Sequence, residues 1–128
     1  MVSTDLIERS RLKLQQSLEA TKGRDARRKL GQFATPSSLA TEILQHARSF
    51  FSPHSEIEFL DPAFGTGVFY STLLNVFSRS NIRKALGFEI DEDYWHAARE
   101  LWNGDSLLDI RLYDFTRASP PKLEQDKF

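Results

Sequence analysis

The sequence predicts an α/β fold with about three parallel strands, flanking helices and an extra N-terminal helix. Two observations support this prediction. Short apolar segments alternate with longer segments in which apolar residues recur every three or four positions, as they do on one face of a helix. Glycine, proline or aspartate, which favour turns, separates most of these segments. Strands and helices that alternate along a chain form a parallel sheet with right-handed crossovers.

The first 30 residues predict a helix followed by a charged linker. The helix covers residues 3–20 and is mostly polar, and the hydroxyl group of Ser3 or Thr4 is suited to an N-cap. Its thin apolar stripe consists of Ile7, Leu14 and Leu18. The linker covers residues 22–29 and is rich in Lys and Arg.

A second helix is predicted between Thr35 and Pro53. Thr35 is the expected N-cap, and Pro36 suits the first helical position because an N–H group is not needed there. A broad apolar face supports the helix. It consists of Leu39, Ala40, Ile43, Leu44, Ala47 and Phe50.

The chain from residue 57 onward predicts three strands and two helices in alternation. The strands cover 57–60, 84–89 and 109–113, and the helices cover 68–78 and 92–103. Asp91 is expected to cap the start of the second of these helices, where a carboxylate favours the helix dipole. Gly104 is expected to cap its end.

Length and composition indicate a globular chain of one domain at most, since 128 residues with 40% apolar and 27% charged side chains are ordinary values. We divide it into an N-terminal helix with a basic linker (1–30), a ligand-binding domain (31–116) and a polar loop or tail (117–128). A run of about 18 apolar residues is absent, which predicts a cytoplasmic protein without a membrane segment.

The charged, cysteine and histidine residues argue against a metal site and leave nucleic-acid binding open. The formal net charge of −1 gives no overall electrostatic case for nucleic acid, although residues 1–30 contain eight Lys or Arg against four Asp or Glu. Cysteine is absent, and His46, His54 and His96 lack the spacing of metal ligands. We expect no metal site.

Residues 61–67 (DPAFGTG) predict a loop that binds a nucleotide-like cofactor, because they join a predicted strand to a predicted helix. Gly65 and Gly67 allow a sharp turn and a close approach of ligand to the backbone. A dinucleotide-binding loop needs a third glycine where Tyr70 stands. Residues 61–78 contain no Lys or Arg to meet a phosphate. The loop therefore suits a nucleoside without phosphates.

Acidic residues end all three predicted strands. Asp61, Glu89 and Asp114 should meet in one crevice, since ligands bind outside the carboxyl ends of parallel strands. Glu89 comes 22 positions after Gly67, the distance at which a carboxylate reaches a ribose diol. Asp114 could accept a hydrogen bond from an adenine amino group, and Phe115 could pack on the ring.

Four segments resemble, in order, the cofactor motifs of S-adenosylmethionine-dependent DNA adenine-N6 methyltransferases of restriction-modification systems. The segments are residues 31–36 (GQFATP), 61–69 (DPAFGTGVF), 87–91 (GFEID) and 114–115 (DF). The resemblance covers about residues 28–116. It implies a partial class I methyltransferase fold, which is Rossmann-like, and makes 31–116 a truncated S-adenosylmethionine-binding domain. The element preceding the glycine loop is characteristic of DNA adenine methylases.

The resemblance also implies the cofactor, the site residues and the partner. Thr35 and the neighbouring backbone would hold the methionine end of S-adenosylmethionine, helped by Phe33 and the loop at Asp61, and the parent protein would act on double-stranded DNA. The expected cofactor-binding residues are Phe33, Thr35, Asp61, Pro62, Ala63, Gly65, Gly67, Glu89, Ile90, Asp114 and Phe115.

Catalytic residues are not expected in this chain. The family holds a flipped-out adenine with an Asn/Asp/Ser-Pro-Pro-aromatic motif, and the similar run Ser119, Pro120, Pro121 and Lys122 is interpreted as a decoy. It follows Asp114 too closely and has a lysine in place of the aromatic residue. We therefore expect an inactive N-terminal fragment, whose first strand, left with an open edge, could mediate self-association.

Two other functions stay open. A methyltransferase for RNA, protein or a small molecule shares the glycine loop and Glu89 but does not need residues 32–36. A non-enzymatic DNA-binding or assembly module could instead use the basic residues between positions 9 and 29.

Overall fold

The computed structural model describes residues 4–23 and 34–118 and confirms the predicted α/β fold. Three parallel strands form one sheet in the order β1-β2-β3. They are β1 (Ile57–Asp61), β2 (Ile82–Glu89) and β3 (Leu108–Leu112). β2 begins two residues before the predicted start, because an irregularity after Ile57 lets that residue pair with Ile82.

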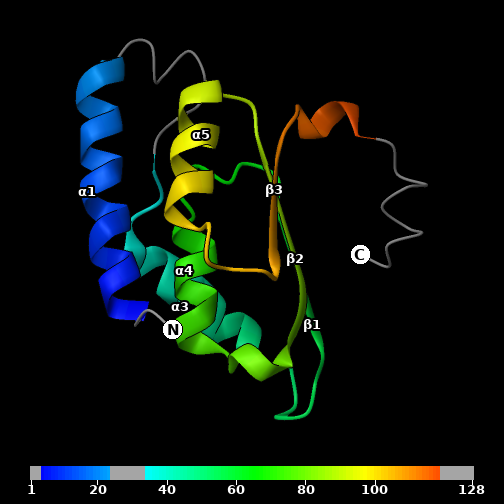
Figure 1. Cartoon of the computed structure of the whole chain (residues 1–128). Coiled ribbons are helices and arrows are strands. Elements are labelled where there is room, and N and C mark those ends of the chain that lie inside the picture. Colours follow the sequence, from blue (N-terminus) through cyan, green and yellow to red (C-terminus); the bar gives the residue numbers. More distant parts are fainter. Residues whose placement is uncertain (1–3, 24–33, 119–128) are drawn as a thin grey trace.

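The α-helices lie on one side of the sheet in Figure 1. They are α1 (Thr4–Lys22), α3 (Ser37–Arg48), α4 (Val68–Val76) and α5 (Glu92–Leu101), with short 3-10 turns at Arg79–Asn81 and Phe115–Arg117. α4 and α5 cover the sheet, while α3 packs on α4, and α1 packs on both α4 and α5 at the outside of the helical layer.

The helix ends correct two predictions and confirm one. α3 begins at Ser37, so Pro36 is the N-cap, with extended backbone (φ −58°, ψ 141°) and no side-chain hydrogen bond. α5 ends at Leu101 and its C-cap is Trp102, so Gly104 does not cap it. Asp91 does cap the start of α5, because its side chain accepts hydrogen bonds from the backbone N–H groups of residues 93 and 94. The expected caps of the first helix, Ser3 and Thr4, lie outside the described side chains.

The hydrophobic core lies between the sheet, α4 and α5. Its central side chain is Tyr70, which is fully buried and contacts the rings of Phe59, Phe64 and Trp102. The Tyr70 hydroxyl donates a 2.6 Å hydrogen bond to Asp105 Oδ2. Tyr70 stands where a dinucleotide-binding loop has its third glycine, and in this structure that position belongs to the core.

The N-terminal helix buries polar residues. Ile7 and Leu14 are half-buried, whereas Arg11 and Gln15 are only 2% and 7% exposed. Hydrophobic periodicity therefore identified the helix but not the side chains that it buries most completely. None of the helices in the described ranges is long and apolar enough to cross a membrane.

Candidate functional site

The carboxyl ends of the three strands and the N-terminal helix surround a pocket of about 370 Å³. Its volume lies within the range usual for small-molecule sites. The predicted cofactor residues that line it are Thr35, Asp61, Pro62, Ala63, Gly65, Glu89, Ile90, Asp114 and Phe115. Gly67 lies in the loop but does not line the pocket, and Phe33 lies outside the described residues.

The loop between β1 and α4 needs glycine at both predicted positions. Gly65 and Gly67 have φ values of +59° and +96°, which residues other than glycine rarely adopt. A Cβ atom at Gly67 would lie 2.7 Å from Trp102 Nε1. That indole N–H donates a 2.9 Å hydrogen bond to the carbonyl oxygen of Thr66, so the close approach fixes the loop against α5.

Asp61 has a carboxylate oxygen without a hydrogen-bond partner. Its Oδ1 atom accepts a 3.0 Å hydrogen bond from the backbone N–H of Ala63, while its buried Oδ2 atom has no partner in the described part of the chain. Burial raises the pKa of the carboxyl group, since ionisation is less favourable away from water. The unpaired oxygen is suited to a ligand that brings a positive charge or an N–H donor.

Glu89 joins the first two loops of the site. Its Oε1 atom accepts a hydrogen bond from the backbone N–H of Gly65 at 2.8 Å, and its Oε2 atom accepts one from the N–H of Asp91 at 2.9 Å. Burial raises its pKa, although these backbone bonds oppose the shift. Each carboxylate oxygen can accept a second hydrogen bond. Glu89 can therefore hold the loops and still bind two ligand hydroxyls.

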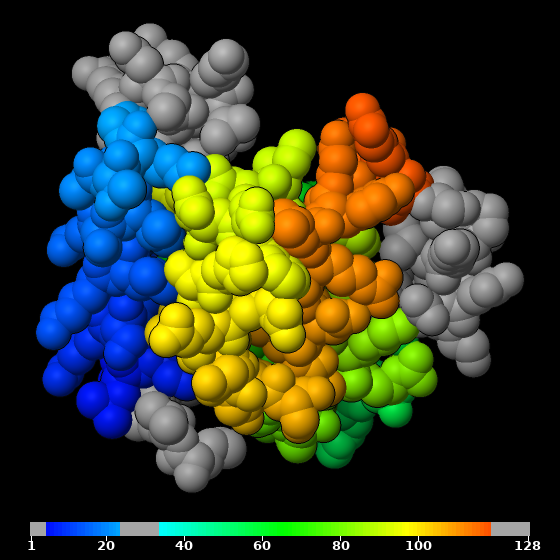
Figure 2. Space-filling model, turned by 45° about the horizontal axis from the view of Figure 1, so that its top comes forward, coloured from blue at the N-terminus to red at the C-terminus, as the bar shows by residue number. Residues whose placement is uncertain are grey.

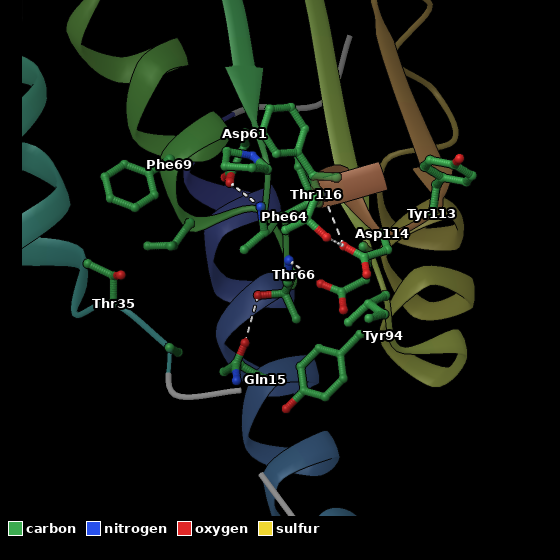
Figure 3. Close-up of a pocket in the computed structure, with 18 residues that line it drawn as sticks. Gln15, Thr35, Asp61, Phe64, Thr66, Phe69, Tyr94, Tyr113, Asp114 and Thr116 are labelled. Carbon is green, nitrogen blue, oxygen red and sulfur yellow. Dashed lines mark hydrogen bonds between the residues drawn. The ribbon is translucent and has the colours of Figure 1, made fainter. Parts of the chain in front are cut away.

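Asp114 and Phe115 form the third side of the pocket, beyond β3. Asp114 Oδ1 accepts hydrogen bonds from the backbone N–H and the hydroxyl of Thr116, at 3.0 and 2.6 Å, and these bonds lower the pKa of Asp114. The ring of Phe115 packs edge-on against Phe88, with centroids 5.2 Å apart. The three acidic side chains expected to meet thus do line one pocket, as Figure 3 shows for Asp61 and Asp114.

Several lining residues were not anticipated. Phe64, Thr66, Val68 and Phe69 lie in or just after the glycine loop, and Ala34, Tyr94, Tyr113 and Thr116 neighbour predicted residues. Closeness in sequence could have identified these. Gln15 had no such signal, because it comes from the mostly polar α1 and reaches the pocket only through tertiary packing.

The pocket is acidic. Three carboxylates line it, and none of the described lining residues is Lys or Arg. This composition disfavours phosphates and favours a cationic or neutral ligand. The run from Ser119 to Lys122 lies outside the described residues.

Comparisons with known proteins identify the fold. No protein-family model matches the sequence. The chain is similar to the crystal structure of a "putative RNA methyltransferase" from Pyrococcus horikoshii, with a TM-score of 0.58 and 21% sequence identity over 70% of this chain. The chain spans less than half of that protein, namely 44% of its length. The three-stranded sheet with its helices therefore matches part of a methyltransferase fold.

Proposed function

We propose that this chain binds S-adenosylmethionine and is the cofactor-binding part of a methyltransferase that modifies adenine N6 in DNA. The observation that carries the proposal is the acidic pocket at the ends of three successive strands, with one unpaired carboxylate oxygen on Asp61. S-adenosylmethionine is a nucleoside without phosphates that carries a sulfonium, an ammonium and a carboxylate group, so its net charge is positive. Both cations match the charge of the pocket.

Each part of this cofactor has candidate partners among the lining residues. Thr35 and Asp61 would hold the methionine end, Glu89 would accept hydrogen bonds from the ribose hydroxyls, and Asp114 with Phe115 would hold the adenine. When bound, the cofactor would supply a methyl group: a nucleophilic nitrogen would take it from the sulfonium sulfur, S-adenosylhomocysteine would be left, and the nitrogen would lose a proton to solvent. The protein's task in this pocket is to bind the cofactor and to orient that group for transfer.

Adenine N6 in DNA is the substrate favoured by the order of the sequence motifs. Residues 31–36 precede the glycine loop as they do in DNA adenine methylases, and Thr35 from this element lines the pocket. Gln32 and Phe33 of the same element lie outside the described residues.

Calorimetry with S-adenosylhomocysteine tests the cofactor. We expect Glu89→Gln to weaken binding by about tenfold or more, because an amide cannot accept at both oxygen positions. The exposed Glu92 lies at the start of α5, and Glu92→Gln should bind like the wild type. Wild-type protein that binds no S-adenosylhomocysteine at millimolar concentration would reject the proposed cofactor. Equal binding by both variants would reject the ribose role of Glu89.

RNA is the second candidate substrate, and the similarity to the archaeal structure supports it. The two candidate substrates can be distinguished by an assay of the parent protein that carries this chain. The protein is incubated with labelled S-adenosylmethionine and either duplex DNA or RNA. Label recovered as N6-methyldeoxyadenosine supports the DNA proposal, whereas label confined to RNA overturns it.

A non-enzymatic DNA-binding function would depend on basic residues such as Arg27, Arg28 and Lys29, which lie outside the described residues. Changing all three to glutamate should abolish salt-dependent retention of DNA if that function is correct. DNA retention that is unchanged in the variant and insensitive to salt would rule out this DNA-binding function.

A further inference from the structure

The N-terminal helix α1 contacts both of the first two loops of the candidate pocket. In its middle, Arg11 and Gln15 hydrogen-bond to Thr66 of the glycine loop. At its last residue, Lys22 Nζ lies 2.9 Å from Oδ2 of Asp91, in the turn after β2. Figure 2 shows this end of α1, in light blue, against the start of α5, in yellow-green. One helix thus holds two loops that leave different strands.

The hydrogen bonds from α1 to the glycine loop have a fixed direction. Arg11 Nη1 donates to Thr66 Oγ1 at 3.1 Å, Thr66 Oγ1 donates to Gln15 Oε1 at 2.9 Å, and Gln15 Nε2 donates to Glu19 Oε1 at 3.0 Å. Arginine can only donate, so the Thr66 hydroxyl must give its single proton to Gln15. These bonds orient the Gln15 amide group. Its second N–H takes no part in this series of hydrogen bonds. Gln15 lines the pocket, as Figure 3 shows.

Arg11 is held in place by Glu8, which in turn bonds to residues of two other helices. Glu8 accepts from its Nε atom at 2.6 Å and from its Nη2 atom at 2.8 Å. Glu8 also accepts from the hydroxyls of Ser37, in α3, and Ser71, in α4, at 3.1 and 2.9 Å. Burial opposes ionisation of Glu8, but the bonds from Arg11 and Ser71 keep its pKa below the usual value. Such a two-bonded pair specifies geometry as well as charge.

We propose that α1 is part of the ligand site, in which Gln15 is a binding residue and Arg11 and Lys22 are positioning residues. Gln15 donates its remaining N–H to an acceptor on the ligand. Arg11 fixes Thr66 and the glycine loop, and Lys22 fixes the turn that follows Glu89. The role of Gln15 rests on the proposed function, because its ligand is the proposed cofactor. If α1 only covered the core, substitution of Gln15, Arg11 or Lys22 would change neither the mobility of the two loops nor the affinity for the ligand.

Hydrogen exchange without ligand tests the positioning role. The double variant Glu8→Gln/Arg11→Met removes both charges together, so that neither is left unpaired. We expect the amides of residues 64–68 to exchange about tenfold faster, which corresponds to one lost hydrogen bond, while the amides of β2 are unchanged. The exposed Arg9 provides the matched control Arg9→Met. Exchange at 64–68 that equals the wild type would overturn the role of Arg11.

Lys22 acts on the other loop and has its own control. Lys22→Met should speed exchange at residues 90–93 but leave residues 64–68 unchanged, whereas Lys13→Met, at an exposed position, should affect neither. Equal exchange in both variants would overturn the role of Lys22. The wild type provides a further measurement: S-adenosylhomocysteine should slow exchange of the α1 amides, because coupling between sites is reciprocal. Binding without such slowing would contradict the proposal.

Calorimetry tests Gln15 directly. Gln15→Leu should weaken S-adenosylhomocysteine binding about tenfold, and Gln16→Leu, at the exposed neighbouring position, should leave it within about twofold. If the wild type binds and both variants bind equally well, Gln15 is not a ligand residue and the proposed function stands. If the wild type does not bind, the proposed function fails, while the exchange measurements still decide the positioning roles.

Discussion

Replacing Asp61 with asparagine should have opposite effects on the stability of the free protein and on ligand binding. Asp61 is 8% exposed, and its Oδ2 atom has no hydrogen-bond partner in the described residues. Asp61→Asn keeps an oxygen for the 3.0 Å bond from Ala63 and removes the buried charge. Removing the charge stabilises the protein by about 1.4 kcal/mol for each unit by which burial raises the pKa of Asp61. The unpaired N–H group of the new amide offsets part of this gain. We expect the free energy of unfolding at neutral pH to stay the same or to rise by up to about 1 kcal/mol.

The same change should weaken binding of S-adenosylhomocysteine by about ten- to a hundredfold. A hydrogen bond between a carboxylate and a charged donor contributes about 1.5–3 kcal/mol, and an amide at this position cannot replace it. Calorimetry and urea unfolding on the same samples measure the two effects. Asp109 provides the control, because it is exposed and pairs with Arg111 at the surface, so Asp109→Asn should change neither quantity appreciably.

The pH dependence of stability checks the physical cause. A carboxyl group whose pKa is raised on folding binds more protons in the folded state, so its contribution to stability is lost as pH rises through the raised value. The stability difference between Asp61→Asn and the wild type should therefore grow from about pH 4 upward and then level off. Ligand affinity of the wild type should increase over the same range. A variant that is less stable by more than about 1 kcal/mol and binds ligand normally would refute the reasoning.

Three further predictions concern the fold around the pocket. Gly87→Ala should destabilise the protein by about 1–3 kcal/mol in urea unfolding, because its Cβ would overlap Phe64 Cδ1, whereas Gly104→Ala, with open space around it, should be neutral. Asp91→Ala should cost about 1 kcal/mol in the same assay through loss of the α5 cap, and an unchanged midpoint would contradict that role. The described strand β1 pairs with β2 along one edge only, so we expect self-association that rises with concentration in sedimentation experiments, and a strict monomer would count against it.

The strand and helix order could be predicted because its signals are local. The short apolar segments located each strand to within two residues, and the acidic residues at the strand ends marked the edge where the pocket lies. The sharp turn at Gly65 and Gly67 also followed from the loop sequence. The ends of α3 and α5 were less predictable, because Thr35 and Gly104 have the residue types of caps but not the positions.

The sequence by itself therefore determined the fold class and the residues that approach the ligand from the sheet. The tertiary structure decided what lies on the other side of the pocket. Arg11 and Gln15 are polar residues on a polar helix, and nothing near them in the sequence indicates that both are buried. Their partner Thr66 lies about fifty residues away, at a separation of 55 from Arg11 and 51 from Gln15. Burial of such groups is tolerated only when most of their donors and acceptors are paired, and that condition depends on the packing of whole elements.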